Sequence, residues 1–449
     1  MNTADPPTKI GIPQVSQRNI LSRERATYIG EETAFGQIPA TFSADASFAT
    51  GMARCFPLGD NLIVGDLSEE MLQVMDEKVR RMDAQQPVHG LKIASKVGGL
   101  KCLLKATPST GQLTDAAVFG VNTSLTPRLM LRHAFGSEHA SVGTTISGTG
   151  SSTTVLTVTD GSVIKKGSFI AVQTGAALVE WAKVVDVDLT ATPDEITVYP
   201  PLSAAPTING WIVRNLYNYA PAETNTKSLC IQQKFVGGSG EETSHTYNGC
   251  YGDLSFDLPE PGKLPSMTLG MTATNYTLGG TLTTDVGTDE MGASAHWAPS
   301  IYLGTAISRI APLVNEGCTI EMKDTVELVR DPSATQTVSS IVRTGGNPSE
   351  VKLGVKLRFD SDYDASFTAD TAYECFIVQK IGTGLTASFW IFHVPVAKLV
   401  AVPKRVNVGS RLHMELAFAG YQDDIALAGT PETGAALDFI RSPLTVAFG

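Results

Sequence analysis

The sequence predicts a mainly β protein with two β-sandwich or barrel units, each flanked by a helix, and a small inserted β-barrel. Three observations support this fold class. Apolar and polar residues alternate in several runs, which is the period of a strand with one buried face. Thr, Ser, Gly, Ala and Val are conspicuous, which favours strands and turns over long helices. A Leu-x-Phe-Asp pattern at residues 254–257 returns at residues 357–360, which suggests two related β units.

Composition bounds the size, charge and compartment of the protein. The 449 residues suffice for two or three domains, each with its own core. The net charge of −11 disfavours adhesion to nucleic acid through its phosphates, although contact with DNA without adhesion stays possible. We expect folding in a cytoplasm without a membrane partner, because residues 1–20 lack a signal peptide core and no run reaches 18 apolar residues.

Cysteine spacing argues for buried thiols rather than a disulfide framework or a zinc site. The sequence has no C-x-x-C pair, which a zinc site would need. The six cysteines are Cys55, Cys102, Cys230, Cys250, Cys318 and Cys375.

Residues 1–24 are polar and rich in proline, and they predict an extended N-terminal arm that is disordered or ordered by a neighbouring subunit. The clearest predicted helix opens at residues 66–70, where acidic residues favour the first turn, and is stopped by Pro87 and Gly90. Its apolar stripe is typical of a helix that covers a sheet.

Residues 142–218 differ in texture from the rest of the chain. Short β-rich runs alternate there with Gly, Asp and Pro turns, which predicts a small β-barrel. We interpret it as an insertion on the exterior of a first β unit, made of residues 25–141 and 219–300. Residues 301–449 form the predicted second unit.

The prediction of two main units is based on strand patterns and on one further predicted helix. In the first unit, residues 254–258 and 267–271 alternate around a Pro-Gly turn. The polar residues 278–293 predict a long loop. In the second unit we expect strands over residues 318–322, 326–328, 353–359, 389–394 and 412–418, and a helix over residues 368–381.

The sequence gives no positive sign of an enzyme, a cofactor or a metal site. Asp360, Asp362 and Asp364 resemble the start of a calcium loop, but Ala365 and Thr371 stand where that loop needs Gly and Glu. A solvated acidic stripe is the favoured interpretation, useful if it faces a DNA channel. The seven histidines have no metal-ligand spacing, and phosphate loops and a G-x-S-x-G motif are absent. We therefore predict no catalytic, cofactor-binding or metal-binding residues.

The chain resembles the tail tube (major tail) proteins of tailed bacteriophages. Residues 28–36, Tyr-Ile-Gly-Glu-Glu-Thr-Ala-Phe-Gly, are similar to the opening segment of that family. Residues 248–257, with 267–269 behind them, resemble its central strand pair. Residues 389–395 and 412–424 resemble its closing strands and acidic turn. The likeness covers most of the chain outside residues 142–218.

The resemblance implies a structural virion protein of a siphovirus-like tail, assembled in the bacterial host cytoplasm. Copies would form stacked rings, either hexamers or pseudo-hexameric trimers, and the rings a tube that conducts double-stranded DNA during ejection without specific binding. It further implies contacts with a tape-measure protein, a tail terminator and baseplate or tail-tip proteins.

Three other functions remain open at the level of the sequence. One is a carbohydrate- or receptor-binding tail protein that uses Trp181 and Trp211 as a sugar platform. Another is a different virion component, such as a terminator, an adaptor or a capsid decoration protein. The third is a tail-associated glycoside hydrolase.

Overall fold

Alternating sequence patterns produce long antiparallel strands through most of the described chain. The computed structural model describes residues 25–32, 35, 53–55, 71–73, 85–87, 95–103, 126–148, 150–222, 228–236, 242–263, 265–278, 299–305, 315–324, 326–329, 340–343, 349–358, 367–368, 370–408, 411–422, 439 and 442–449. The prediction of a mainly β protein is confirmed.

One sheet of 17 strands organises the molecule. Its members are β1 (Arg25–Glu31), β2 (Ala53–Cys55), β5 (Ser95–Leu103), β6 (Gly136–His139), β13 (Tyr217–Pro221), β14 (Leu229–Val236), β15 (Glu242–Pro259), β16 (Ser266–Ala273), β17 (Asn275–Leu278), β18 (Ser300–Gly304), β19 (Asn315–Asp324), β22 (Ser349–Arg358), β23 (Tyr373–Ile381), β24 (Ser388–Leu399), β25 (Lys404–Val408), β26 (Arg411–Tyr421) and β27 (Thr445–Phe448).

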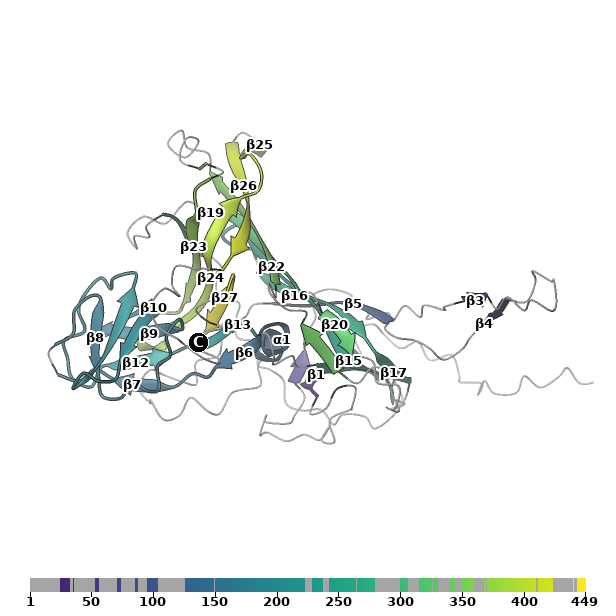
Figure 1. Ribbon diagram of the computed structural model, residues 1–449, viewed down its shortest axis with the longest axis horizontal. Helices are drawn as coiled ribbons and strands as arrows, with labels where there is room; N and C mark the ends of the chain where they lie inside the picture. Colours follow the sequence, from purple (N-terminus) through teal and green to yellow (C-terminus); the bar gives the residue numbers. More distant parts are fainter. Residues whose placement is uncertain are drawn as a thin grey trace, which may run out of the picture.

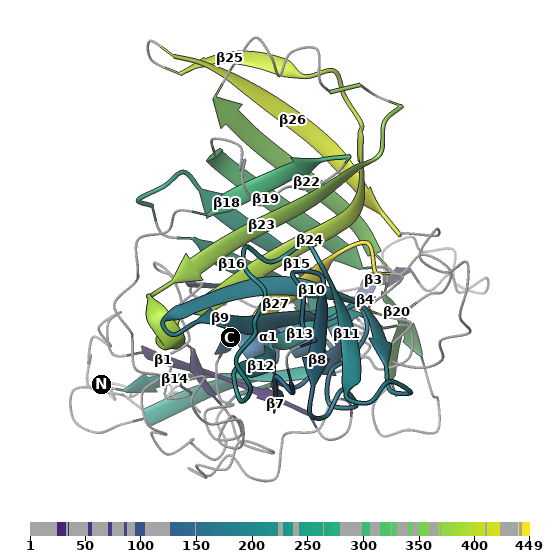
Figure 2. The same ribbon diagram turned by 90° about the vertical axis from the view of Figure 1, so that its left-hand side faces the viewer.

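This sheet folds over on itself into two layers. The first, here called the polar wall, runs β5–β16–β15–β19–β22–β26, with β25 on the far side of β26. The second, the middle layer, runs β18–β23–β24–β27–β13–β6. The layers join where the last residues of β26 pair with β24. Figure 2 shows β18, β19, β22, β23, β24, β25 and β26 crossing the upper half of the molecule.

A separate six-stranded sheet lies within residues 143–215. Its order is β7 (Gly143–Thr145), β12 (Ile212–Asn215), β9 (Phe169–Gly175), β10 (Leu178–Asp188), β11 (Asp194–Tyr199) and β8 (Val155–Val158). A bridge between Ile146 and Val158 links the two end strands, so the sheet closes into a small barrel. Because β6 pairs with β13, the barrel occupies the position of a hairpin turn between these two strands.

Two apolar cores hold three layers together. The first fills the space between the polar wall and the middle layer, where Phe256 meets Phe392 edge-on with ring centroids 4.9 Å apart. The second joins the middle layer to the barrel, where Trp181 lies 5.3 Å from Phe376. Figure 1 shows the barrel on the β23–β24 side of the sheet and β16 and β22 on the opposite side. The barrel is therefore a packed structural layer as well as an insertion.

Helix α1 (Thr126–Phe135) closes the base of the first core with Leu129, Met130, Leu131 and Phe135. The sequence analysis missed this helix. Short further elements are η1 (Gly384–Thr386), the pair β3 (Met71–Gln73) and β4 (Gln85–Pro87), and the pair β20 (Val326–Val329) and β21 (Ser340–Arg343).

Both predicted helices are wrong where the structure describes them. Residues 71–73 of the first form β3, whose pairing with β4 supplies the backbone hydrogen bonds that a helix would have made internally. Residues 373–381 of the second form β23. Apolar residues at Tyr373, Phe376 and Ile377 imitate helical spacing because both faces of β23 are buried, one in each core.

Strands predicted in the second unit are present in the structure. Burial alternates along β19 and β22, and β24 is buried on both faces over its first seven residues, as expected of the run at residues 389–394. The expected strands at residues 326–328 and 412–418 are also present, within β20 and β26. These predictions are confirmed.

Removal of the ring at the centre of the first core should cost much of the stability. Phe392→Ala empties a buried site against Phe256, and large-to-small core changes of this kind cost about 3–5 kcal/mol. Urea denaturation followed by circular dichroism measures the loss. Val402→Ala, at an exposed position, should change stability by less than about 0.5 kcal/mol. Equal losses in the two variants would contradict the assigned core.

One histidine in β6 should make the fold sensitive to acid. Burial, and then the nearby charge of Lys165, lower the pKa of His139 from 6.5 to about 4, and its ring stacks on Phe439 at 3.9 Å. Between pH 6.5 and 4 the unfolded chain therefore binds a proton that the folded chain does not, so stability falls as the pH falls through this window.

We expect this histidine to account for up to about 3 kcal/mol of acid destabilisation. The measurement is the free energy of unfolding at pH 7 and pH 4.5 for the wild type and for His139→Gln. The variant should lose less stability on acidification than the wild type. An identical loss in both proteins would rule out this origin of the pH dependence.

Candidate functional site

The outward face of the polar wall is the most extensive candidate surface in the described chain. Apolar side chains of β15, β19, β22 and β26 point into the first core, so their alternate residues point away from it. These outward positions carry charged or small residues, namely Asp253, Ser255, Asp257, Thr319, Glu321, Lys323, Glu350, Lys352, Gly354, Lys356, Arg358, Glu415, Ala417 and Ala419.

Strand register places opposite charges beside each other on this face. Glu321 is the cross-strand partner of Lys352, and Lys323 is that of Glu350. Lys356 Nζ lies 3.7 Å from Glu415 Oε1 on the next strand. Cross-strand pairs of opposite charge stabilise a sheet modestly, by about 0.2–1 kcal/mol each. They also leave the described part of this face nearly balanced in charge.

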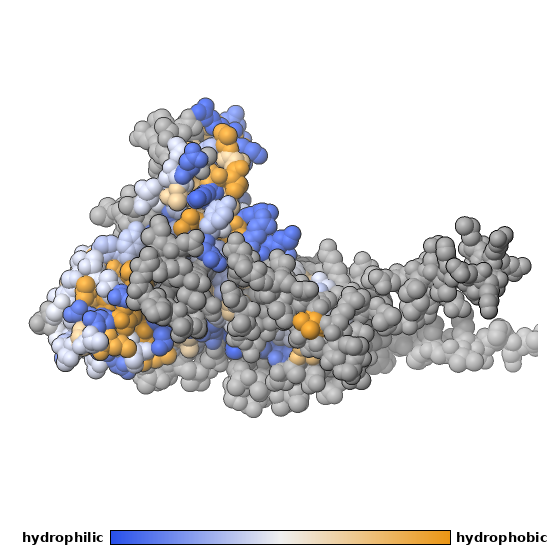
Figure 3. All heavy atoms as spheres, viewed as in Figure 1, coloured by the Kyte–Doolittle hydropathy of each residue, from blue (hydrophilic) through white to orange (hydrophobic). Residues whose placement is uncertain are grey.

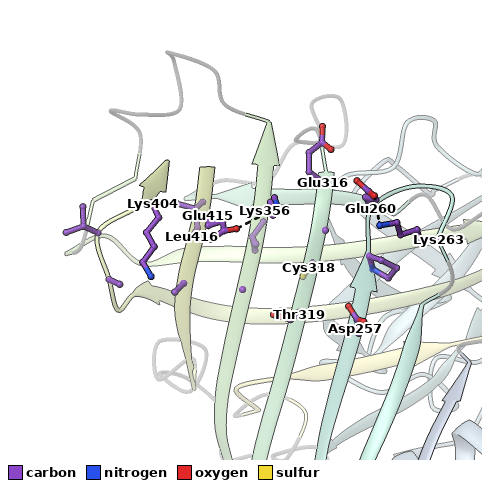
Figure 4. Close-up of a pocket in the computed structure, with 17 residues that line it drawn as sticks. Asp257, Glu260, Lys263, Glu316, Cys318, Thr319, Lys356, Lys404, Glu415 and Leu416 are labelled. Carbon is purple, nitrogen blue, oxygen red and sulfur yellow. Dashed lines mark ion pairs between the residues drawn. The ribbon is translucent and has the colours of Figure 1, made fainter. Parts of the chain in front are cut away.

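A groove of about 610 Å³ crosses the polar wall. Its floor is a row of small residues in register, with Thr319 beside Gly354 and Gly354 beside Ala417. A side chain at Gly354 would force Thr319 to move, because an added Cβ would lie 2.6 Å from the Thr319 hydroxyl oxygen. Figure 4 shows the charged side chains of the groove rising from adjacent strands.

Ion pairs occupy the rim of the groove. Lys263 Nζ lies 2.7 Å from Glu260 Oε1 in the turn between β15 and β16. This hydrogen bond lowers the pKa of the Glu260 carboxyl and raises that of the Lys263 ammonium, so both groups stay charged near neutral pH. Arg358 Nε lies 3.4 Å from Glu316 Oε1. The rim therefore offers balanced charge rather than a concentrated anion or cation site.

An irregular segment closes one end of the groove. Leu399 of β24 pairs with Phe418, and Lys404 of β25 pairs with Glu415, so four residues of one strand face two of β26. The extra residues, 400–403, bulge outward, and Val402 is 84% exposed. Bulges of this kind are typical of sheet edges, where they re-aim side chains.

A buried carboxylate fixes the geometry from which the polar wall rises. Glu32 Oε1 accepts a hydrogen bond from the Gly249 backbone N–H at 2.8 Å, and Glu32 Oε2 accepts one from the Ser228 hydroxyl at 2.5 Å. Gly249 has φ of +60°, and an added Cβ would lie 1.9 Å from the Thr274 hydroxyl oxygen. Here β15 changes partners, from β14 and β17 to β16 and β19.

Two segments singled out in the sequence analysis thus meet in space. Residues 28–32 belong to the opening segment of the family resemblance, and residues 248–250 to its central strand. The side chain of Glu32 joins them across more than 200 residues of sequence. No spacing in the sequence reveals this contact, because it depends on the pairing of β1 with β14 and of β14 with β15.

The described cysteines are inert, as predicted. Cys230, Cys250, Cys318 and Cys375 are buried free thiols. Burial raises the pKa of Cys375 to about 12 and raises those of the other three strongly, so none forms a reactive thiolate near neutral pH. The side chains of Cys55 and Cys102 lie outside the described part of the chain.

The histidines that lie in strands or in α1 are mostly packed into the protein. His133, His393 and His413 are buried, and His393 Nε2 lies 2.8 Å from Glu374 Oε1 between the middle layer and the barrel. Neighbouring rings stack on His393, with Phe376 at 4.4 Å. His393 and Glu374 lie where the middle layer packs against the barrel, away from the groove, and this position supports a structural role for both residues.

Other candidates from the sequence are resolved only in part. Asp360, Asp362 and Asp364 lie outside the described residues, as do residues 1–24 and most of the predicted loop at 278–293. Trp181 is buried in the second core, so it offers no exposed ring for a sugar, and Trp211 packs against the interior of the barrel. The described residues contain no group of three His, Cys, Asp or Glu placed to hold a metal ion.

Comparison with known proteins adds no family assignment. No protein-family model matches the sequence, and no curated protein matches it either. Among the described helices, none has the length and apolar character needed to cross a membrane.

The hydrogen bonds from Glu32 should contribute more to the free energy of unfolding than the ion pair between Glu31 and Arg132. Glu32→Ala leaves the Gly249 N–H and the Ser228 hydroxyl buried without this acceptor, at about 1–3 kcal/mol for each group. Glu31→Ala is the matched control, because Glu31 makes a partly exposed ion pair with Arg132 at 3.3 Å that is worth about 0–1 kcal/mol. Thermal and urea unfolding compare the two, and equal effects would contradict this role of Glu32.

Proposed function

We propose that this chain is a tail tube subunit of a bacteriophage, in which copies join through sheet edges and the polar wall faces the channel. The observation that carries the proposal is the three-layer arrangement. The wall has one face in the first core and one polar face toward solvent, and the barrel covers the opposite side of the molecule. The resemblance in residues 28–36 and 248–257 supports the same function.

Open sheet edges supply a means of assembly. Among the described residues, β5 pairs only with β16, and β18 pairs only with β23. Strand edges with unused backbone groups readily pair with another chain. When each copy joins the next through two different edges, the contact is heterologous, and it closes into a ring if the rotation permits. Stacked rings would then form the tube.

The balanced charge of the polar wall suits the passage of DNA. Tight binding to DNA arises when Lys and Arg neutralise phosphates and release counterions. On the wall, Lys352 faces Glu321 and Lys356 faces Glu415, so each lysine already has an acidic neighbour. We infer that phosphates gain little by adhering, which lets the duplex slide. Local pairing of charges on the described part of the wall is the physical basis of this inference.

In this proposal the barrel of residues 143–215 lies on the exterior of the tube. The first Leu-x-Phe-Asp pattern lies on β15, and Leu357 and Arg358, the described residues of the second, end β22; β19 separates these two strands of the wall. Two related strands in one wall favour a duplicated unit and hence a pseudo-hexameric trimer. The tape-measure protein, the tail terminator and the baseplate or tail-tip proteins are the proposed virion partners.

Electron microscopy with two proline variants tests the assembly mode. Successive backbone N–H groups of a strand point to opposite sides, so one of Gly98 and Gly99 in edge strand β5 directs its N–H away from β16. Proline at that position blocks pairing with another copy but removes no hydrogen bond to β16. Proline at the other position removes a bond within the subunit.

We expect purified wild-type protein to form long hollow tubes in negative stain. One of Gly98→Pro and Gly99→Pro should keep the wild-type melting temperature within a few degrees and yet form no tubes, while the other should be clearly less stable. Normal tubes from the variant that keeps its melting temperature would refute edge pairing through β5. Discrete particles from the wild type, with neither rings nor tubes, would refute the proposed function.

A further inference from the structure

An acidic hairpin extends from the inserted barrel. It comprises residues 185–195, the end of β10, the connecting turn and the start of β11. Two apolar side chains are prominent on it, Val185 at 44% and Leu189 at 54% exposure. Four acidic residues surround them, Asp186, Asp188, Asp194 and Glu195, and the sequence from 184 to 213 contains no Lys, Arg or His.

Local contacts leave this hairpin negative. Lys166 Nζ lies 3.4 Å from Asp186 Oδ1, which offsets one of the four charges. Asp194 Oδ2 accepts the Gly161 N–H at 2.7 Å, and Asp188 Oδ1 accepts the Thr190 N–H and hydroxyl. The hydrogen bonds to Thr190 lower the pKa of Asp188, which keeps it ionised. The turn is thus an ordered acidic surface with an apolar centre.

A basic edge with the opposite character lies at another margin of the molecule. It comprises residues 398–408 together with Arg411, and contains the bulge beside the groove. Val400 is 61% and Val402 84% exposed. The cations are Lys398, Lys404, Arg405 and Arg411, and the sequence from 395 to 414 contains no Asp or Glu. Glu415, across from Lys404, is the nearest acidic residue along β26.

The two surfaces carry charges of opposite sign, and they agree in the number of charges and in the number of exposed aliphatic side chains. Each presents two exposed aliphatic side chains within a group of four like charges. Figures 1 and 2 both place β25 at the top of the molecule, away from β10 and β11, so the surfaces do not meet within one copy. Figure 3 shows hydrophobic and hydrophilic residues side by side at both places.

We propose that the acidic hairpin of one copy docks against the basic edge of a neighbouring copy. Complementary charge would orient the encounter and suppress wrong pairings, and the valine and leucine side chains would supply the buried apolar centre. The contact is heterologous, so every copy in an assembly can both give and receive it.

The inference rests on the self-assembly proposed above and assigns the barrel a role in it. A patch of two hairpins is smaller than the roughly 1,200–2,000 Å² of a stable isolated interface. The contact is therefore weak on its own and acts by avidity, once the sheet edges hold two copies together. In this arrangement the barrel is an external brace between neighbours.

Reciprocal charge reversal of the full chain tests the contact. The first variant carries Lys404→Glu with Arg405→Glu, and the second carries Asp188→Lys with Glu195→Lys. Each variant leaves one surface with two charges of each sign, so the net charge attraction between the acidic hairpin and the basic edge is lost. A mixture restores opposite charges at every contact between unlike copies. A control variant, Asp370→Lys, reverses one charge at an exposed position outside both surfaces and outside the polar wall.

The readouts are the protein concentration at which light scattering reports assembly, sedimentation velocity, and negative-stain images. We expect each variant alone to need at least about tenfold more protein than the wild type, because the charge complementarity that orients the contact is lost. The mixture and the control should lie within about threefold of the wild type. The defect should shrink in about 0.5 M salt, where screening is stronger. Melting temperatures should not change.

Wild-type assembly by either variant alone would overturn the docking proposal, and so would a mixture that remains impaired. The two proposals fail separately. Rescued association into discrete oligomers without tubes would retain the docking contact and refute the tube. Normal tubes from each variant alone would retain the tube and refute the contact. A wild-type chain that stays monomeric would refute both.

Discussion

The structure depends on one bent strand and on the buried carboxylate that holds the bend. Strand β15 has 18 residues, and two different sets of neighbours share it. Gly249, with φ of +60°, adopts the left-handed conformation that glycine tolerates best, at the point where β15 changes its neighbours. Glu32 then fixes the turn through the Gly249 N–H. The base around α1 and the polar wall are consequently one continuous sheet.

The distribution of apolar residues then determines which face of each layer must be covered. The middle layer is apolar on both faces, so it needs the polar wall on one side and the barrel on the other. This explains why an insertion at the β6–β13 hairpin carries Phe169 and Trp181 toward Phe376. The wall needs only one apolar face, and its other face is left to polar residues.

Sequence patterns located the strands well where only one face is buried. The runs at residues 353–359 and 412–418 were predicted as strands, and their described residues form strands with the expected inward set, because period two distinguishes a half-buried strand from a helix. The same reasoning failed at residues 373–381, where burial on both faces removes the alternation. It also missed α1, whose local sequence carries no acidic first turn to mark its start.

By itself, the sequence determined the mainly β class, the buried thiols of Cys230, Cys250, Cys318 and Cys375, and the distinct texture of residues 142–218. Those features depend on local composition and period, which a linear chain displays. Only the tertiary structure decided that Glu32 would reach Gly249, that Lys356 would face Glu415, and that the barrel would complete the second core. Register and layer order fix these contacts, and both are set by pairing between segments far apart in the chain.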